Sequence, residues 1–234
     1  MSTGTRQNHV DYSWSEKGPA RTVSTAFILG GLLGLGLGLI LLSDTLVGYG
    51  FYLVGLALFH LWEYLWVSMY DHTLLSSKSF LINHSSAFNF ALLLGFVEFW
   101  IEWYLFPSMK SFGYLNMLGA LTMFVGQAFR TKAMIKAGTN FSHIVQDTKR
   151  SDHKLVTDGI YQYMRHPSYF GWFVWSVSTQ LVQFNPICIV GYAWASWRFF
   201  SERIEDEEDF LVGFFGNDYK EYRKRVWSGI PLIK

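Results

Sequence analysis

The sequence has a single cysteine, Cys188, among its 234 residues, so an intrachain disulfide and a cysteine-rich zinc site are both excluded. The motifs HExxH, GxSxG and the phosphate-binding P-loop are also missing, and metalloprotease, serine-hydrolase and nucleotide-hydrolysis chemistries therefore lack their characteristic residues. His143, His153 and His166 are spaced by ten and thirteen residues, which matches no compact ligand pattern. We predict no metal site.

Charge is scarce and balanced. Charged residues make up 16% of the chain, and the formal net charge is +1. No basic stripe of the kind that tracks phosphates is present, so we expect no nucleic-acid partner. We interpret the short basic run YKEYRKRV (219–226) as a contact with anionic lipid headgroups.

Long apolar runs dominate what is present. The run VSTAFILGGLLGLGLGLILL (23–42) has no charge and is long enough to cross a hydrocarbon core of about 30 Å. Mostly polar residues precede it and no small-residue cleavage site follows, which favours a membrane helix over a cleaved signal peptide. Similar runs follow at 46–69, 86–106, 112–131, 169–184 and 186–200. We predict an all-α integral membrane protein with about six transmembrane helices.

The last two runs are short, because sixteen residues span roughly 24 Å as a helix. We predict that they form a helical hairpin over 169–200 that turns at FNP (184–186). The residues best suited to chemistry flank this hairpin. We therefore expect three regions: an N-terminal tail (1–22), a four-helix transmembrane region (23–136), and a catalytic region (137–234). In the last of these, the 137–168 loop and the C-terminal helices form a cap.

Lysine and arginine fix the expected orientation, because cytoplasmic loops carry an excess of them. When the loops are assigned to alternate sides, both terminal tails, the second joint and the long fourth joint fall together. The opposite side keeps Lys110. We predict that both termini and the cap are cytosolic.

Three glycines lie on one face of the first apolar run: Gly30, Gly34 and Gly38. Small residues spaced by four let another helix backbone approach closely. Packing within the chain and pairing with a second copy are both open at this point.

Three carboxylates lie inside apolar runs: Glu63, Glu98 and Glu102. His60 shares a helix face with Glu63, and Glu98 shares one with Glu102. Carboxylates at membrane depth are costly and usually face the helix bundle or a watery cavity. Structural and directly functional roles are both open for them.

The stretch YMRHPSYFG (163–171) places polar residues at the mouth of a hydrophobic helix. Pro167 fits the first turn of a helix, where its missing N–H is not needed. Ser168 and Tyr169 would then belong to a helix N-terminus with unpaired N–H groups, which suits a carboxylate ligand. We predict a ligand-facing helix mouth.

A second polar group follows the last apolar run. In RIEDEE (203–208), Arg203 and Glu207 lie one helical turn apart. These charges could simply be solvated at the membrane surface. They could also hold an anionic substrate group beside a cationic cofactor, because a guanidinium binds a carboxylate through two parallel hydrogen bonds.

Together these segments resemble a known family. The sequence RHPSYFGWFVWSVSTQLVQFNPIC, followed by WRFFSERIEDEEDFLVGFFGNDYKEYRKRVWSGIPLI, is similar to the isoprenylcysteine carboxyl methyltransferases. The resemblance covers residues 24–234, is densest from residue 141, and is greatest to the shorter, fungal-type members. It implies an enzyme of the endoplasmic reticulum membrane that methylates the C-terminal carboxylate of prenylated proteins after CaaX processing. The implied methyl donor is S-adenosylmethionine, which leaves as S-adenosylhomocysteine.

The resemblance also implies site residues. Arg203 would bind the substrate carboxylate, and Arg203 and Glu207 would be the catalytic pair. The cofactor would be bound in the cap by Gln146, His153, Lys154, Leu155, Val156, Tyr161, His166, Pro167, Ser168, Tyr169 and Glu207. This chain reads AGTNFSH at 137–143 where AGHSFSH is expected, a departure outside these positions.

The implied chemistry agrees with the missing catalytic triad. An α-carboxyl group has a pKa of about 3.5 and is already ionised at neutral pH, so no general base is required. Stripping water from it and aligning it at about 3–3.5 Å from the methyl group are required. A prenyl chain would come from the bilayer, with the aromatic residues at 170, 172, 173 and 175 either lining its path or packing as core.

Two other functions fit parts of the pattern. A phospholipid or small-lipid methyltransferase has a related C-terminal cofactor pattern, but its amine acceptor makes Arg203 unfavourable. A non-catalytic membrane receptor for prenylated tails would not need His166, Tyr169 and Glu207 together.

Overall fold

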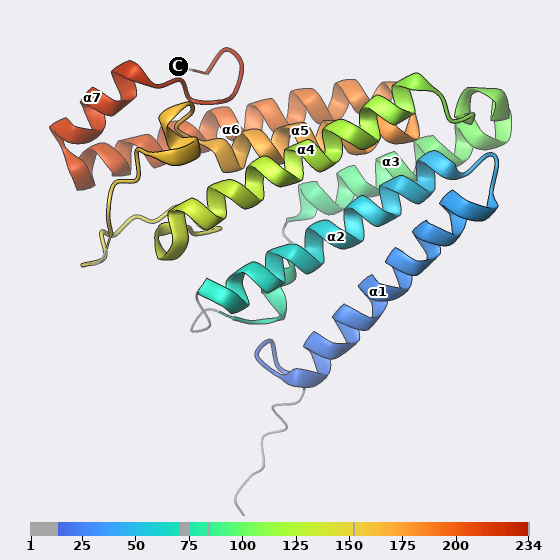
Figure 1. Ribbon diagram of the computed structural model, residues 1–234, viewed down its shortest axis with the longest axis horizontal. Coiled ribbons are helices and arrows are strands. Elements are labelled where there is room, and N and C mark those ends of the chain that lie inside the picture. Colours follow the sequence, from blue (N-terminus) through green and yellow to red (C-terminus); the bar gives the residue numbers. More distant parts are fainter. Residues whose placement is uncertain (1–13, 71–74, 84, 152, 234) are drawn as a thin grey trace, which may run out of the picture.

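The computed structural model describes residues 14–70, 75–83, 85–151 and 153–233, so residues 1–13 of the predicted N-terminal tail lie outside it. Apart from one isolated bridge between Met164 and Trp227, the regular structure of the described residues is helical. The helices run back and forth along the long axis (Figure 1). They are α1 (Pro19–Leu42), α2 (Val47–Tyr70), α3 (Ser86–Leu105), α4 (Tyr114–Ala137), α5 (Pro167–Gln183), α6 (Pro186–Phe215) and α7 (Asn217–Arg225).

The six apolar runs correspond to α1 to α6, and α6 continues beyond the end of the last run. We expected the hairpin to end at residue 200, whereas α6 is one helix of 30 residues that ends at Phe215. The charged segment after residue 200 continues the helix because Glu and Arg are good helix formers. The helix stops at Gly216, whose φ of 56° is in the region that favours glycine.

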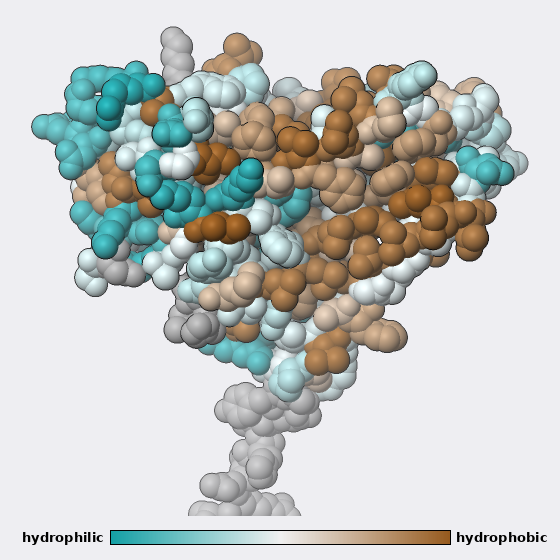
Figure 2. Space-filling model, in the orientation of Figure 1, coloured by the Kyte–Doolittle hydropathy of each residue, from teal (hydrophilic) through white to brown (hydrophobic). Residues whose placement is uncertain are grey.

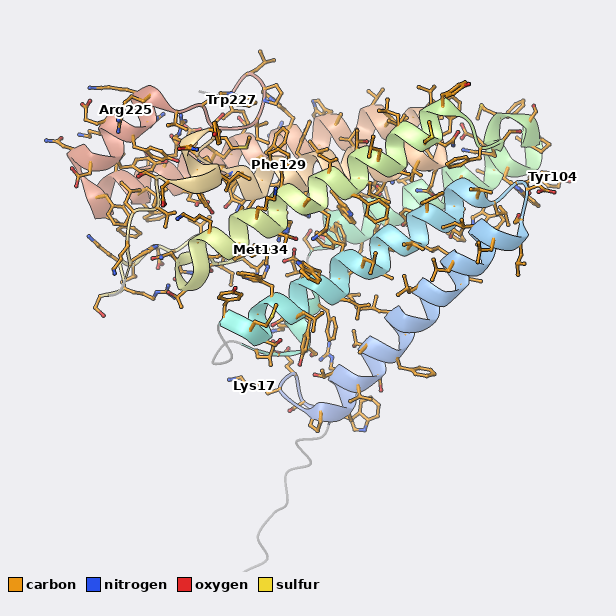
Figure 3. The ribbon with its side chains drawn as sticks, in the orientation of Figure 1. Lys17, Tyr104, Phe129, Met134, Arg225 and Trp227 are labelled. Atoms are coloured by element: carbon orange, nitrogen blue, oxygen red, sulfur yellow. The ribbon has the colours of Figure 1, made fainter. Side chains whose placement is uncertain are left out.

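Three of the described helices, α1, α2 and α3, are long and apolar enough to cross a membrane by length and composition. The chain is therefore a multi-pass membrane protein by this criterion. Apolar surface extends over the first helices, whereas hydrophilic residues gather at the end that carries α7 (Figure 2). Arg225 and Trp227 lie at that end, and Tyr104 lies at the opposite end (Figure 3).

Glycines let α4 and α5 touch through their backbones. A Cβ atom on Gly126 would lie 2.6 Å from the Trp175 nitrogen, and one on Gly171 would lie 2.5 Å from the Arg130 nitrogen. Next to this contact, the rings of Phe59 and Trp175 stack with their centroids 4.1 Å apart. This packing fixes the start of α5 against the end of α4.

One of our two alternatives was that the glycine face of α1 packs against another helix of the chain. The structure does not show this packing. A Cβ atom on Gly30, Gly34 or Gly38 would meet nothing within 4 Å. The close approach is made instead by Gly36, where an added Cβ would lie 2.8 Å from the Gly50 oxygen on α2. The three predicted glycines are therefore left on an open face.

The carboxylates of α3 support the turn between α5 and α6. Glu98 accepts hydrogen bonds of 2.7 Å from the N–H groups of Ile187 and Cys188, which begin α6. Glu102 lies 2.7 Å from the buried Lys110 ammonium. The same ammonium donates to the turn through Gln183 O, Phe184 O and Asn185 Oδ1. Both carboxylates have a structural role.

Candidate active site

A pocket of about 130 Å3 lies between the segment 137–169 and helices α6 and α7. We call it the polar pocket because charged side chains such as Lys154 and Glu207 form part of its wall, beside apolar ones. The structure brings together here all eleven residues that the resemblance assigned to the cofactor. They are Gln146, His153, Lys154, Leu155, Val156, Tyr161, His166, Pro167, Ser168, Tyr169 and Glu207. The pocket wall also contains Asn140, which accepts a hydrogen bond of 2.8 Å from the Lys154 N–H. The departure from the family pattern at residue 140 therefore touches the pocket, although Asn140 is not one of the eleven positions.

The residues that lead into α5 are held in place by the C-terminal segment that contains Ser228. Pro167 is the first residue of α5, as predicted. The N–H of His166 donates to Ser228 O at 2.9 Å, which fixes the approach to the helix. The N–H groups of Tyr169 and Phe170 donate to His166 O at 3.1 and 3.0 Å. The Tyr169 N–H is paired within the chain, so the prediction of an unpaired N–H group was wrong for this residue.

Arg203 and Glu207 both project from α6 and are linked through Tyr169. Arg203 Nε donates to the Tyr169 hydroxyl at 2.8 Å, and that hydroxyl donates to Glu207 Oε2. Arg203 Nη2 donates to His143 O at 2.7 Å. The guanidinium also lies over the rings of Tyr169 and Phe199, at 5.4 and 5.9 Å from their centroids. These contacts hold the arginine side chain in one orientation.

The neighbouring Glu208 is a buried charge that the sequence analysis missed. Its carboxylate lies 2.6 Å from Arg165 Nε, 3.0 Å from His166 Nε2 and 2.9 Å from Arg223 Nε. Burial alone would raise the pKa of Glu208, but the hydrogen bonds from His166 and Arg165 outweigh burial and lower it. Glu208 therefore stays ionised and joins α6, α5 and α7 beneath the pocket. The last glutamate of RIEDEE was the available signal.

Tyr161 contributes a neutral polar wall. Burial, followed by the nearby Glu207 carboxylate, raises the pKa of Tyr161. Its main-chain oxygen accepts a hydrogen bond of 2.5 Å from the Tyr222 hydroxyl, which ties the wall to α7. Because its pKa is raised, the Tyr161 phenol is protonated at neutral pH.

An apolar cavity of about 520 Å3 adjoins the polar pocket. Arg203 is part of its lining, and Phe141, Ser142 and Tyr169 line both spaces. Its walls are otherwise mainly aromatic and aliphatic side chains of α2, α3, α5 and α6. Of the four aromatic residues that we considered for such a path, Trp172 and Trp175 line the cavity, whereas Phe170 and Phe173 pack beside the cluster around Phe200, Ile204 and Ile230.

In the described part of the chain, no group of three or more His, Cys, Asp or Glu side chains is placed to hold a metal ion. The three histidines that we considered are not brought together as a triad. His143 contacts Glu63 at 2.6 Å, His166 contacts Glu208, and His153 lies against the rings of Phe214 and Phe215.

This arrangement of the pocket, the cavity and Arg203 defines a class of protein. It is a helical membrane protein in which a polar pocket and an apolar cavity meet at Tyr169, and a fixed arginine lines the cavity beside this tyrosine. Such a site can hold a water-soluble ligand on one side and the polar head of a lipid-like ligand on the other.

Comparison with known proteins gives the family. Residues 117–213 match the model of the isoprenylcysteine carboxyl methyltransferase family. A protein-S-isoprenylcysteine O-methyltransferase of Dictyostelium discoideum is 61% identical over 94% of this chain and 93% of its own length. The Saccharomyces cerevisiae protein of the same name is 38% identical, over 97% of this chain and 98% of its own length. The chain belongs to the isoprenylcysteine carboxyl methyltransferase family.

A solved structure is similar as well. It is described as the eukaryotic intramembrane Ras methyltransferase, isoprenylcysteine carboxyl methyltransferase, without a monobody. It is 44% identical to this chain, with a TM-score of 0.88 over 89% of this chain and 75% of its own. The similarity extends through the fold, and the all-helical membrane architecture is that of the family.

Proposed function

We propose that this enzyme transfers a methyl group from S-adenosylmethionine to the C-terminal carboxylate of a prenylated cysteine. Its family and its relatives support methyl transfer to S-isoprenylcysteine. One observation carries the residue assignment: Arg203 lines the apolar cavity and is joined through Tyr169 to Glu207 in the polar pocket. A prenylated acceptor needs such a junction, because its chain is apolar and its reacting carboxylate is charged.

The polar pocket fits S-adenosylmethionine by the chemistry of its walls. Glu207 offers a carboxylate to a cationic ligand, and Phe210 and Phe214 supply aromatic surface beside it. Lys154 adds a positive charge for the ligand carboxylate. S-adenosylmethionine would supply an electrophilic methyl group on a sulfonium sulfur.

In the reaction we propose, Arg203 binds the substrate carboxylate and aims one oxygen at the polar pocket. That oxygen forms a bond to the methyl carbon while the carbon–sulfur bond breaks, and the electron pair stays on sulfur. The products are a methyl ester and S-adenosylhomocysteine, and no proton is transferred. Arg203 would hold the carboxylate and Glu207 the sulfonium, and the opposite charges of these two reacting groups both disappear during transfer. The two residues therefore align the reacting groups and exclude water.

The apolar cavity would receive the prenyl chain. Each buried CH2 group contributes about 0.8 kcal/mol, so a cavity of this kind favours the lipid over solvent. Trp172 and Trp175 provide rigid aromatic surface in its wall. This arrangement explains why a carboxyl methyltransferase is embedded in a membrane.

We further propose the arrangement in the membrane that the sequence suggested. The six helices α1 to α6 would span or enter the bilayer of the endoplasmic reticulum, with both termini and the polar pocket cytosolic. The tail (1–22), the transmembrane region (23–136) and the catalytic region (137–234) would be its functional divisions. The 137–168 loop and the C-terminal helices would form the cofactor-binding cap, and α7 would contact lipid headgroups. A second copy would pair through the open face formed by Gly30, Gly34 and Gly38.

The test is transfer of labelled methyl from S-adenosylmethionine to N-acetyl-S-farnesylcysteine in membranes that contain this chain. We expect base-labile methyl ester from the wild type and at least a hundredfold less from Arg203→Ala, because the alignment of the acceptor is lost. Arg198→Ala is the matched control, since Arg198 is on the same helix and pairs with the exposed Glu202. If S-adenosylhomocysteine binds but no ester forms, the acceptor is wrong and an amine-containing lipid is the next substrate to assay.

A further inference from the structure

Glu63 is a buried carboxylate that the proposed reaction does not use. It lies on α2 and is 0% exposed. Arg130 on α4 donates to it twice, from Nε at 2.5 Å and from Nη2 at 2.9 Å. His143 Nε2 approaches the same carboxylate at 2.6 Å. One carboxylate therefore joins α2, α4 and the segment between α4 and α5.

The histidine connects this cluster to the substrate arginine. The side chain of His143 contacts Glu63, and its main-chain oxygen accepts the hydrogen bond from Arg203 Nη2. His143 therefore cannot shift without disturbing its contact with Glu63 or its hydrogen bond with Arg203. The position of Arg203 Nη2 is therefore coupled to Glu63 through one residue.

The arginine connects the same cluster to the mouth of α5. Arg130 Nη1 donates to the Ser168 hydroxyl at 2.9 Å, and Ser168 lies in the wall of the polar pocket. Arg130 and His143 also line the apolar cavity. Glu63 thus has one connection to the acceptor side of the site and one to the cofactor side.

Burial decides how strictly this cluster holds its geometry. Arg130 is 5% exposed and Glu63 is fully buried, so water does not offer alternative partners. Removing one member of such a buried pair is costly, because the other charge is left without a partner. Exposed ion pairs near the site, such as Arg198 with Glu202, do not have this constraint.

We propose that Glu63 is a positioning residue of the methyl transfer. Through His143 it sets the orientation of Arg203, and through Arg130 and Ser168 it sets the first turn of α5 against the cofactor. It does not touch either substrate, and the inference rests on the function proposed above. The specific consequence is that acceptor and cofactor binding are both tuned from a residue on α2.

The experiment compares three variants in the methyl-transfer assay, with KM for N-acetyl-S-farnesylcysteine and Kd for S-adenosylhomocysteine measured separately. Glu63→Gln keeps the shape and removes the charge. His143→Ala removes the contact with Glu63 and leaves the main-chain oxygen. Glu102→Gln is the matched control, because Glu102 is a carboxylate on α3 that pairs with the buried Lys110, and neither residue lines the polar pocket or the apolar cavity.

We expect Glu63→Gln to lower kcat by about 10- to 100-fold, since small misplacements of aligned groups have effects of this size. It should also raise both KM for the acceptor and Kd for S-adenosylhomocysteine. His143→Ala should raise acceptor KM and leave Kd for S-adenosylhomocysteine within twofold. Glu102→Gln should lower thermal stability and leave the kinetic constants of the folded enzyme unchanged.

Failure of the two proposals can be told apart. If the wild type forms no ester, the proposed function is wrong. If the wild type is active and both Glu63→Gln and His143→Ala keep wild-type kcat and acceptor KM, Glu63 is structural and the positioning role is refuted. If Glu63→Gln does not fold, the acceptor KM of His143→Ala alone decides: an unchanged value refutes the role.

Discussion

The Tyr169 hydroxyl is the one group that joins the two charges of the proposed site, which makes Tyr169→Phe the sharpest perturbation of it. The ring stacks on Phe200 with centroids 4.9 Å apart and lies parallel to His166 at 5.4 Å. Phenylalanine keeps these contacts. The change therefore removes the two hydrogen bonds to Arg203 and Glu207 and little else.

The size of the effect follows from those two bonds. A hydrogen bond to a charged group contributes about 1.5–3 kcal/mol. Tyr169 is partly exposed, so water can replace part of this loss. We expect a net cost of about 2 kcal/mol in transition-state stabilisation, which is roughly a 30-fold drop in kcat/KM at about 1.4 kcal/mol per factor of ten.

The assay is methyl-ester formation with each substrate varied in turn. Because the hydroxyl contacts both Arg203 and Glu207, we expect kcat/KM to fall for acceptor and donor alike. Tyr163→Phe is the control, because it removes a hydroxyl on the same segment from a residue that is 70% exposed. Tyr163→Phe should keep full activity.

The reasoning is refuted if purified Tyr169→Phe keeps kcat/KM within twofold of the wild type for both substrates. In that case Arg203 and Glu207 work independently of each other. A fall with the acceptor alone would place the tyrosine with Arg203 and remove it from the cofactor wall.

The other two predictions concern stability. Gly126→Ala forces a Cβ atom against the Trp175 nitrogen at 2.6 Å, so we expect a loss of about 1–3 kcal/mol and a Tm lower by roughly 2–10 °C in a thermal scan. Gly213→Ala, which meets nothing within 4 Å, should not lower Tm, and equal losses in both would contradict the packing. Glu208 has a lowered pKa, so its contribution is present above its ordinary value near 4.5 and is lost as pH falls through the folded-state value. We expect Glu208→Gln to flatten the decrease of Tm below pH 4.5, and an unchanged slope would mean that other groups control acid unfolding.

The sequence alone was sufficient to locate the helices, because the features that indicate a helix are local in the sequence. Length and absence of charge define a membrane run, and Pro167 and Pro186 mark the starts of α5 and α6. The motif from 163 to 171 and the spacing of Arg203 and Glu207 were sufficient for the family. The end of α6 does not follow from the apolar run, because apolar composition stops near residue 200 whereas the helical hydrogen bonds continue to Phe215.

The tertiary structure decided what each polar residue touches. Nothing local in the sequence pairs Glu63 with Arg130, which is 67 positions away, or distinguishes the open face of Gly30 from the packed Gly36. Glu207 and Glu208 are adjacent and identical, yet one lines the pocket and the other is buried among Arg165, His166 and Arg223. Successive residues on a helix point in directions about 100° apart, so their roles depend on which elements pack on each side. Those packing partners are set by contacts between distant segments, which only the folded chain brings together.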